Sequence, residues 1–363
     1  MSDREKIMRI AIIGAGMTGV SAASALAEAG AEVIVFDKGR GPGGRMSSKR
    51  LQADDATGGY LQLDMGAQYF TARHPWFLRQ VLQWQQQGLV QRWEFAPHVW
   101  QHGLLLPSDD AAIRYVGTPA MHQPLRAALG SLQQYYSCRV TELSYSQSSF
   151  SSQQSGEWTI STADGASHAG FDALILTCPP EQCRQLLASQ PLAEQIPANL
   201  LLPSWAVALE LAEPVKHQAV GIFGKSGALS WCARNNTKPG RSGIAEHWVL
   251  HLNAQTSLQL LEATPEAVAA VAEQAFSRIV GQQLQVTSAL CHRWLYASYN
   301  TELTPPGVLS DPAQRLMVAG DWSLGGRVEN AWLAGVMVAS QLLPEQIKAP
   351  DLSATSADFM LDR

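Results

Sequence analysis

Apolar runs separated by helix-forming stretches predict an α/β fold at the start of the chain. Residues 9–13 form a short apolar, β-branched run, and residues 32–36 form a second one. Such runs are typical of strands buried in a parallel sheet. The stretch 20–29 between them is rich in alanine, a strong helix former, and Gly30 follows where that helix is expected to end. These residues therefore predict a β-α-β unit.

The same pattern returns near the end of the chain. Residues 172–177 form a buried run that stops at Pro179, and residues 315–319 form another, followed by a predicted helix at 330–343. Periodicity predicts further strands and amphipathic helices in the middle of the chain, at 76–87, 135–168, 205–211, 245–252 and 265–280.

These elements predict a Rossmann-type dinucleotide-binding domain, built from both ends of the chain, with an inserted α+β substrate domain. A length of 363 residues exceeds one ordinary core. We expect the dinucleotide-binding domain to be discontinuous and to comprise 1–72, 110–185 and 305–345. The substrate domain is expected to comprise 73–109 and 186–304, and a loose tail is expected at 346–363.

Composition and charge argue against several classes of protein. The net charge of −5 gives no reason to expect a nucleic-acid partner. The polar N-terminal residues do not predict a signal peptide, and no window approaches 18 uninterrupted apolar residues, so no membrane partner is expected. Five cysteines without Cys-x-x-Cys spacing predict reduced thiols and a cytoplasmic protein. No metal site is expected, because His247 and His251 lie in a predicted strand without an intervening glutamate.

A glycine motif follows the first predicted strand. Gly14, Gly16 and Gly19 form a Gly-x-Gly-x-x-Gly pattern, and Asp37 ends the next strand. The first glycine allows a tight turn, the second allows close approach of a pyrophosphate, and the third allows the helix to pack on the strand. The helix N-terminus attracts phosphate, and Asp37 is suited to accept hydrogen bonds from a ribose. The motif predicts a dinucleotide cofactor.

Two further segments favour FAD over NAD. The glycine-rich loop 37–45 follows the second strand, and near the C-terminus Gly320-Asp321 ends a strand shortly before another helix. A second helix N-terminus directed at the same crevice would stabilise negative charge on a flavin ring. A plain NAD dehydrogenase does not need that device.

At these residues the chain resembles the flavin-containing amine oxidase superfamily, with its glutathione reductase-like FAD-binding fold, and within it the renalase branch. The shared pattern comprises the glycine motif, Asp37, the Gly43-Gly44-Arg45 loop, the segment Asp64 to Ala67, and Gly320-Asp321. Monoamine oxidases of this superfamily attach their flavin to a cysteine near the C-terminal motif. No cysteine follows Cys291 here, so the resemblance implies FAD held without a covalent bond. The motif and the resemblance together give the following expected cofactor-binding residues: Gly14, Ala15, Gly16, Met17, Thr18, Gly19, Asp37, Lys38, Gly44, Arg45, Met46, Ala67, Gln68, Tyr69, Cys178, Pro179, Asp321, Val328 and Glu329.

The resemblance also implies an activity. Renalases oxidise dihydro-NAD(P) isomers, reduced at ring position 2 or 6, to NAD(P)+ by hydride transfer to flavin N5, and oxygen is reduced to hydrogen peroxide. The expected partners are therefore a dinucleotide substrate and oxygen. A hydride that leaves an electron-rich ring requires no general base, so the absence of an evident catalytic dyad agrees with this activity.

Several residues are candidates for substrate binding. Arg234, Lys238 and Arg241 lie in one loop that also contains Asn235, and such a loop suits a diphosphate, with a solvated basic loop as the alternative. His251 shares a strand face with His247, and that face is a candidate border of the flavin, the alternative being buried histidines without a ligand.

Candidates for a catalytic role are His247, Trp294, Tyr296 and Tyr69. Trp294 and Tyr296 share a predicted strand face that is suited to stack on a nicotinamide ring, and core packing is the alternative. Three other functions stay open: a flavin amine oxidase for a small amine or polyamine, an isoprenoid desaturase, and a flavin-bound redox sensor without turnover.

Overall fold

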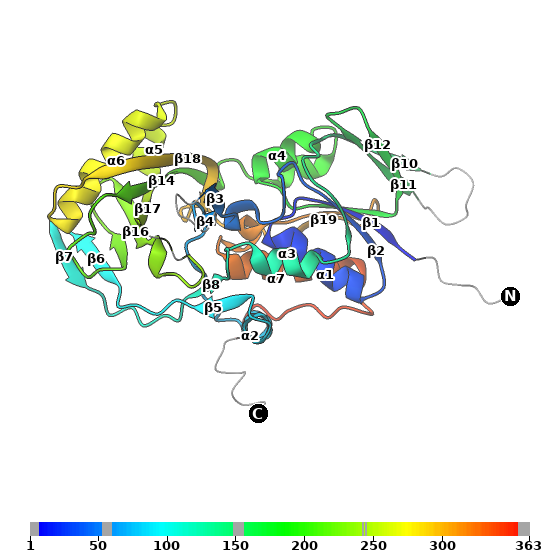
Figure 1. The fold of residues 1–363 in the computed structure, drawn as a ribbon. Coiled ribbons are helices and arrows are strands. Elements are labelled where there is room, and N and C mark those ends of the chain that lie inside the picture. Colours follow the sequence, from blue (N-terminus) through cyan, green and yellow to red (C-terminus); the bar gives the residue numbers. More distant parts are fainter. Residues whose placement is uncertain (1–6, 53–59, 148–155, 242, 244, 355–363) are drawn as a thin grey trace.

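The computed structural model describes residues 7–52, 60–147, 156–241, 243 and 245–354. It consists of two lobes, each built on one large sheet (Figure 1). Strands of the first sheet come from residues 9–36, 133–176 and 309–318, whereas those of the second come from residues 98–107 and 201–299. The expected fold class, a Rossmann-type domain with an inserted α+β part, is confirmed.

The first lobe is a six-stranded sheet of order β19-β20-β13-β1-β2-β9. Its strands are β1 (Arg9–Ile13), β2 (Glu32–Phe36), β9 (Gln133–Tyr135), β13 (Ala173–Leu176), β19 (Leu309–Asp311) and β20 (Leu316–Val318). All neighbours pair in parallel except β19, which runs antiparallel to β20.

The two faces of this sheet have different covers because successive strand residues point to opposite faces. Ile10 and Ile12 pack under the helices α1 (Met17–Glu28), α3 (Gln123–Leu129) and α7 (Val328–Leu342). Ala11 and Ile13 pack under a three-stranded sheet of β10 (Val140–Gln147), β11 (Gly156–Thr162) and β12 (Ser167–Phe171). Burial on both faces explains why these strands read as unbroken apolar runs.

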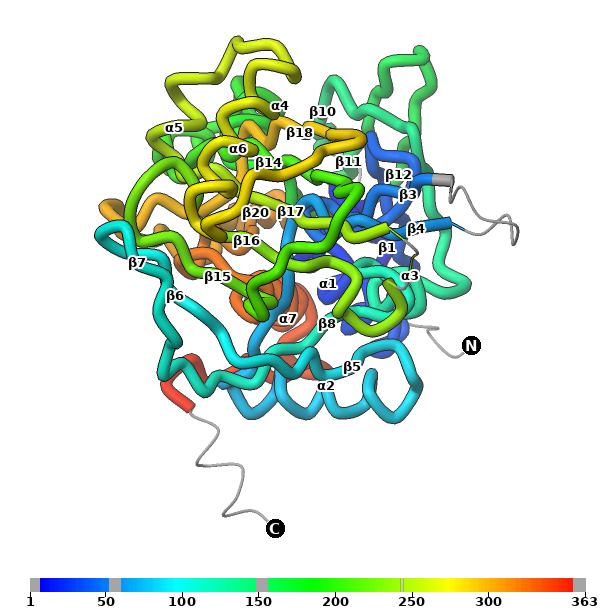
Figure 2. The backbone as a smooth tube through the Cα atoms, turned by 60° about the vertical axis from the view of Figure 1, so that its left-hand side comes forward, coloured from blue at the N-terminus to red at the C-terminus, as the bar shows by residue number. Residues whose placement is uncertain are grey.

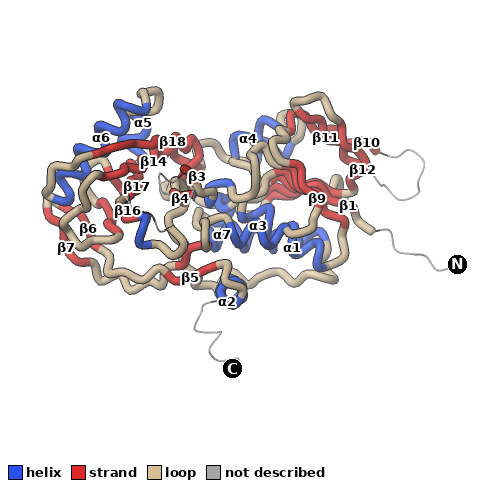
Figure 3. Tube along the Cα trace, in the orientation of Figure 1, coloured by secondary structure: helices blue, strands red, loops and turns tan. Residues whose placement is uncertain are grey.

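The second lobe is a seven-stranded sheet of order β18-β14-β17-β16-β15-β6-β7. Its strands are β6 (His98–Gln101), β7 (Leu104–Pro107), β14 (Leu201–Leu211), β15 (Gly221–Gly224), β16 (Leu229–Arg234), β17 (Glu246–Leu252) and β18 (Val286–Tyr299). Helices α5 (Ala254–Gln259) and α6 (Pro265–Val280) lie on the outer side of this sheet (Figure 3). The other face is left for the first lobe.

The remaining elements are short. They are the hairpin β3 (Lys49–Gln52) and β4 (Tyr60–Leu63), the pair β5 (Val90–Arg92) and β8 (Tyr115–Gly117), helices α2 (Pro75–Gln86) and α4 (Pro180–Leu186), and the 3-10 turns η1 (Gly44–Met46), η2 (Pro191–Gln195), η3 (Asn235–Thr237) and η4 (Asp321–Leu324).

The structure differs from the expected domain division in two places. Phe77, Val81 and Trp84 of α2 pack into the core of the first lobe, so only the β6–β7 part of 73–109 joins the second sheet. The C-terminal segment up to residue 354 runs past α2 (Figures 1 and 2), and the carbonyl of Asp351 lies 2.8 Å from Nε2 of His74. The segment therefore contacts the start of α2 through His74, and residues 355–363 lie outside the described part.

Within the described residues, none of the helices has both the length and the apolar character that crossing a bilayer requires.

Candidate active site between the two sheets

The turn after β1 opens a cradle at the N-terminus of α1. Gly14 has a φ of +114°, which favours glycine, and its N–H donates to the carbonyl of Phe36 at 2.8 Å. A Cβ at Gly19 would lie 1.9 Å from the carbonyl oxygen of Gly14. At Gly16 a Cβ would meet no atom within 4 Å, so open space lies beside this turn. The three glycines therefore perform separate tasks, as the motif predicts.

Asp37 lies at the carboxyl end of β2 beside this cradle. Its Oδ2 accepts a hydrogen bond from the N–H of Ala15 at 2.6 Å, and its Oδ1 accepts one from the N–H of Gly39 at 2.6 Å. A carboxylate has about four lone-pair sites, so Asp37 keeps acceptor capacity for a ribose. Lys38 lies on the surface, where its Nζ donates to Oε1 of Gln182 at 3.1 Å.

Arg45 joins the glycine-rich loop to the Gly-Asp segment. Its Nη1 donates to Oδ2 of Asp321 at 3.0 Å and to the carbonyl of Ala297 at 3.1 Å, and its Nη2 bonds Oδ1 of the same aspartate. The carbonyl of Arg45 accepts from the N–H of Ala67 at 2.8 Å. A Cβ at Gly66 would lie 2.0 Å from that carbonyl oxygen. Three of the expected cofactor segments therefore meet at Arg45.

The remaining expected cofactor residues occupy different surroundings. Met17, Thr18 and Met46 are buried. Cys178 and Pro179 follow the carboxyl end of β13, and the carbonyl of Cys178 accepts from Nε1 of Trp322 at 3.3 Å. These five expected cofactor residues lie at or near the carboxyl edge of the parallel strands, where doubly wound sheets bind ligands.

Helix α7 begins at Val328 and places the positive end of its dipole on the side of Asp321. The side chain of Glu329, in contrast, is turned to the start of α2. Its Oε1 accepts from the backbone N–H groups of Arg73 and His74 at 2.6 and 2.5 Å, which satisfies donors at a helix end. The structure thus gives Glu329 a structural contact, and its contact with a flavin stays a prediction.

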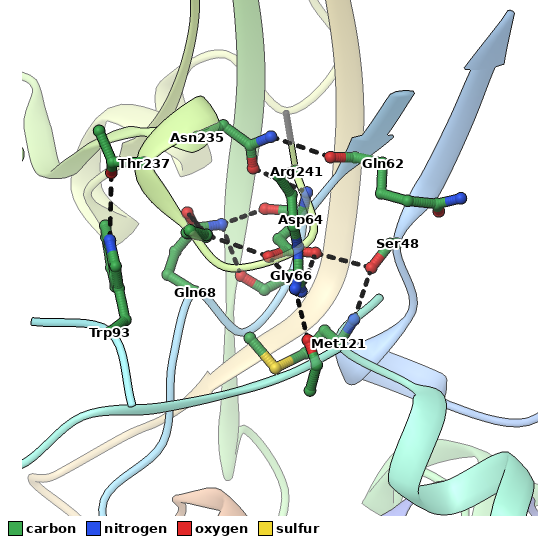
Figure 4. Close-up of polar contacts among 12 residues, drawn as sticks. Ser48, Gln62, Asp64, Gly66, Gln68, Trp93, Met121, Asn235, Thr237 and Arg241 are labelled. Atoms are coloured by element: carbon green, nitrogen blue, oxygen red, sulfur yellow. Dashed lines mark hydrogen bonds and ion pairs between the residues drawn. The ribbon is translucent and has the colours of Figure 1, made fainter. Parts of the chain in front are cut away.

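A buried cluster of charges lies behind the loop that contains Gly66 (Figure 4). We call Ser48, Asp64, Gln68, Lys238 and Arg241 the Asp64 cluster. Oδ2 of Asp64 lies 3.1 Å from Nζ of Lys238 and 3.0 Å from Nη2 of Arg241, and Oδ1 accepts from the hydroxyl of Ser48 at 2.6 Å. Nζ of Lys238 also donates to Oε1 of Gln68 at 3.0 Å. The side chains of Asp64, Lys238 and Arg241 have no exposed surface.

Burial and neighbouring charges set the protonation states in the Asp64 cluster. Burial alone would raise the pKa of Asp64, but Lys238 and Arg241 together hold it below its usual value. Burial lowers the pKa of Lys238 to about 8, although the Asp64 carboxylate opposes this shift. At neutral pH the cluster therefore has one negative and two positive groups, and its net charge is positive.

The structure corrects the expectation that the loop of Arg234, Lys238 and Arg241 binds a diphosphate. Lys238 and Arg241 turn inward to Asp64, whereas Nη1 of Arg234 lies 3.5 Å from Oε2 of Glu246 and its guanidinium stacks over the Trp248 ring. A fully buried cation with carboxylate and carbonyl partners is not free to contact a ligand.

Asn235 is likewise a buried structural residue. Its Nδ2 donates to the carbonyl of Gln62 at 2.9 Å, and its Oδ1 accepts from the N–H of Asp64 at 3.4 Å. The amide thus ties η3 to the β4 strand that carries Asp64 into the cluster.

His251 also faces this loop and is held neutral. Its Nε2 lies 3.4 Å from Nε2 of Gln68, and its ring bonds the backbone of Met65. Burial, with a smaller contribution from the charge of Lys238, lowers the pKa of His251 to about 4. Since the Gln68 amide nitrogen is a donor, Nε2 of His251 is assigned as the acceptor.

A row of side chains crosses three strands next to this loop. Phe223 of β15 is in register with Trp231 of β16, which is in register with His251 of β17. The Trp231 ring lies 5.4 Å from the ring of Tyr69, and that of Phe223 lies 4.8 Å from Trp231. With Trp93, these rings form what we call the aromatic wall, comprising Tyr69, Trp93, Phe223 and Trp231. The neighbouring residues Cys232 and Leu250 point to the opposite face, under α6.

The other catalytic candidates are separated by the structure. Nε2 of His247 lies 3.3 Å from Oε2 of Glu210, near the end of β17 remote from His251. Nε1 of Trp294 donates to the carbonyl of Met65 at 2.8 Å, so its ring supports the loop. Tyr296 packs with the core on the other face of the first sheet. Trp294 and Tyr296 therefore do not form the shared stacking face that was expected.

Asp64, Trp93, Phe223 and Trp231 were not among the predicted site residues. Asp64 lies in a segment that the resemblance singles out, which was the available signal. Nothing local in the sequence marks Trp93 or Phe223, because their proximity to Tyr69 depends on how the lobes pack.

The residues present fit FAD. The cradle at Gly16 offers open space to a pyrophosphate, Asp37 has spare acceptor capacity beside it, and Arg45 supplies a cation at the junction of the loops.

Comparison with protein families gives two matches. A model described as NAD(P)-binding Rossmann-like domain matches residues 12–83. A second model, described as flavin containing amine oxidoreductase, matches residues 101–343, which is more than half of the chain.

Two desaturases among the curated proteins are similar to a short segment of this chain. A zeta-carotene-forming phytoene desaturase from Myxococcus xanthus is 47% identical over 57 residues, which are 16% of this chain and 11% of the desaturase. A 4,4'-diapophytoene desaturase from Staphylococcus aureus is 46% identical over 59 residues, which are 16% of this chain and 10% of that protein. The match therefore spans about a tenth of the curated relatives.

Solved structures show the same fold at low sequence identity. An Exiguobacterium sp. 255-15 protein assigned as a protoporphyrinogen oxidase has a TM-score of 0.67 at 13% identity, over 95% of this chain and 100% of its own. A putrescine oxidase double mutant has a TM-score of 0.66 at 13% identity, over 93% of this chain and 100% of its own.

Proposed function

Because the chain belongs to the flavin containing amine oxidoreductase family, we propose that it is an FAD-dependent oxidase of dihydro-NAD(P) isomers. In this reaction the substrate ring loses a hydride and becomes NAD(P)+, and oxygen is reduced to hydrogen peroxide. The proposal extends the family assignment to one substrate class.

FAD is the cofactor of the family. When bound, it supplies a hydride acceptor that is reoxidised by oxygen. The chain's own contribution is to hold the pyrophosphate at Gly16, the ribose at Asp37 and the ring beside the loop of Gly66 to Tyr69.

The observation that carries the proposal is the net positive charge of the Asp64 cluster. Its two cations and one carboxylate are buried directly behind Gln68, and the ammonium of Lys238 lies 5.1 Å from the centre of the Trp93 ring. A positive potential at this place disfavours a protonated amine. A dihydropyridine ring is uncharged and is compatible with it.

The aromatic wall supports the same substrate class. Tyr69, Trp93, Phe223 and Trp231 offer ring faces, and the neighbouring His251 is neutral. Planar rings stack on such surfaces. Ring faces also attract ammonium groups, so the preference for an uncharged ring rests on the positive charge of the Asp64 cluster and not on the wall alone.

Anaerobic stopped-flow absorbance tests the proposal. The FAD-loaded protein is mixed separately with 2-dihydro-NAD, 6-dihydro-NAD, ordinary NADH and a panel of amines, and photoreduced protein gives the full amplitude. We expect a dihydro isomer to bleach the flavin band rapidly, NADH and the amines to act slowly, and peroxide to form once air is admitted. Bleaching by an amine alone overturns the proposal in favour of an amine oxidase. Bleaching by none of these compounds also overturns it.

A further inference from the structure

Lys238 belongs to the Asp64 cluster through its contacts with Asp64 and Gln68. Its ammonium has three donors, and two of them are used, on Oδ2 of Asp64 at 3.1 Å and on Oε1 of Gln68 at 3.0 Å. The third side of the ammonium faces the Trp93 ring at 5.1 Å. Asp64 and Gln68 belong to one segment of the chain and Trp93 to another, so Lys238 links the η3 loop to both of them.

Gln68 transmits this contact to the loop. Its Nε2 donates to the carbonyl of Gly66 at 3.2 Å and to the carbonyl of Asp64, while its Oε1 accepts from Lys238. The amide can be oriented this way only if a donor faces Oε1, because a carbonyl oxygen cannot accept from another acceptor. Protonated Lys238 is the donor that the structure supplies at that position. The orientation of Gln68 therefore depends on Lys238.

The loop from Met65 to Tyr69 also contacts the two segments, around Arg45 and Asp321, that are expected to bind FAD. The N–H of Ala67 donates to the carbonyl of Arg45, whose guanidinium bonds Asp321. Gln68 and Tyr69 follow directly, and Tyr69 belongs to the aromatic wall. A change at Lys238 is thus two contacts away from the Arg45–Asp321 junction.

We propose that Lys238 is a positioning residue for the cofactor: its ammonium fixes Gln68 and the loop from Met65 to Tyr69, and it supplies the net positive charge behind that loop. The proposal rests on the family's cofactor and not on the identity of the substrate. Fixed positive charge near a group that gains negative charge on reduction makes that reduction more favourable.

Lys238 is the group of the Asp64 cluster whose pKa lies nearest to neutral pH. Burial brings its pKa to about 8. Asp64 stays ionised and Arg241 stays charged, and burial holds His251 and His122 toward their neutral forms. Arg126 and Arg50 face His122 from α3 and β3 and keep their charge. Only Lys238 in this set changes charge as the pH rises past 8.

The test is the midpoint potential of bound FAD, measured by dye-coupled titration at several pH values, together with the Kd for FAD. In the unmodified protein the plot of potential against pH should bend near pH 8. In Lys238→Met the potential should be lower at pH 7, the bend should disappear, and FAD should bind about tenfold more weakly. In Lys238→Arg the charge is permanent, so the potential at pH 7 should be retained while the bend disappears.

Lys216→Met is the control, since its backbone N–H bonds Gln282 on the surface of the second lobe; it should match the unmodified protein. If the unmodified protein shows no bend between pH 7 and 9, or if both Lys238 variants keep the bend, the assignment is overturned. The bend in the plot of potential against pH is measured on the unmodified protein, so this readout does not depend on any variant folding. None of the measurements needs a substrate. Failure of the proposed function would therefore leave this test intact.

Discussion

The ammonium of Lys238 lies 3.1 Å from Oδ2 of Asp64, although 174 residues separate the two in the sequence and neither side chain is exposed. The pair joins the β4 strand of one short hairpin to the η3 loop of the second lobe. Its geometry explains why a loop rich in basic residues is not a surface ligand site. With Arg241 as a second cation on the same carboxylate, the Asp64 cluster has a net positive charge.

Removal of the carboxylate from this pair should be costly. Asp64→Asn leaves Lys238 and Arg241 buried without an anion, and breaking a buried pair in this way costs about 3–5 kcal/mol. Urea unfolding at pH 7 measures the loss. Glu262→Gln is the control, because its pair with Arg293 is exposed and should contribute below about 1 kcal/mol. Equal, small losses in both variants would show that the Asp64 cluster is not a stabilising network.

Acid should destabilise the protein through His251. Its pKa in the folded state is lowered to about 4 by burial, whereas the unfolded value is near 6.5. A lowered pKa contributes stability that is complete above pH 6.5 and is lost as the pH falls toward 4. In that window the folded state resists protonation and the unfolded state does not.

The difference between the unmodified protein and His251→Asn isolates this contribution. We expect the unfolding free energies of the two to converge as the pH is lowered from 6.5 to 4.5. His102→Asn removes an exposed histidine and is the control variant. A constant difference for His251→Asn would contradict the neutral assignment.

The planar fork of Arg45 should be required for FAD affinity. Two of its nitrogens bond the Asp321 carboxylate while Nη1 also reaches the carbonyl of Ala297. A lysine retains the charge but cannot form the bidentate contact. Arg45→Lys should therefore weaken FAD binding by about tenfold, as followed by quenching of FAD fluorescence on reconstitution. Arg293→Lys, on the surface of β18, should bind FAD normally; a normal Kd for Arg45→Lys would contradict the role of the fork.

FAD should be released on denaturation. No cysteine lies beyond Cys291, so the cysteine attachment of the monoamine oxidases has no counterpart near the C-terminal motif. Acid precipitation of the yellow protein should leave the flavin in the supernatant, and the mass of the unfolded chain should equal that of the polypeptide. A flavin that stays in the pellet would contradict non-covalent binding.

Trp231 should tolerate loss of its indole nitrogen. Among the described residues its buried Nε1 has no hydrogen-bond partner, whereas Nε1 of Trp205 donates to the carbonyl of Leu260 at 2.9 Å. Trp205→Phe should lose about 1 kcal/mol of unfolding free energy in excess of Trp231→Phe, because only Trp205 gives up a hydrogen bond. Thermal unfolding of both variants compares them. The reverse order would show that Trp231 has a partner in solution.

The sequence alone determined the local elements of this fold. The runs at 9–13 and 32–36 predicted buried parallel strands, and Gly14, Gly16 and Gly19 predicted the turn and the close helix that the structure has. It also predicted that His247 and His251 share a face of β17. These features follow from neighbouring residues, because strand alternation and glycine conformations are local properties.

Only the tertiary structure decided what the side chains contact. The loop of Lys238 and Arg241 reads as a basic surface until Asp64, from a distant strand, is placed against it. Trp93, Phe223 and Tyr69 come together through three separate segments. Periodicity shows which residues are buried but not which partner they meet, since that depends on the packing of one sheet against the other.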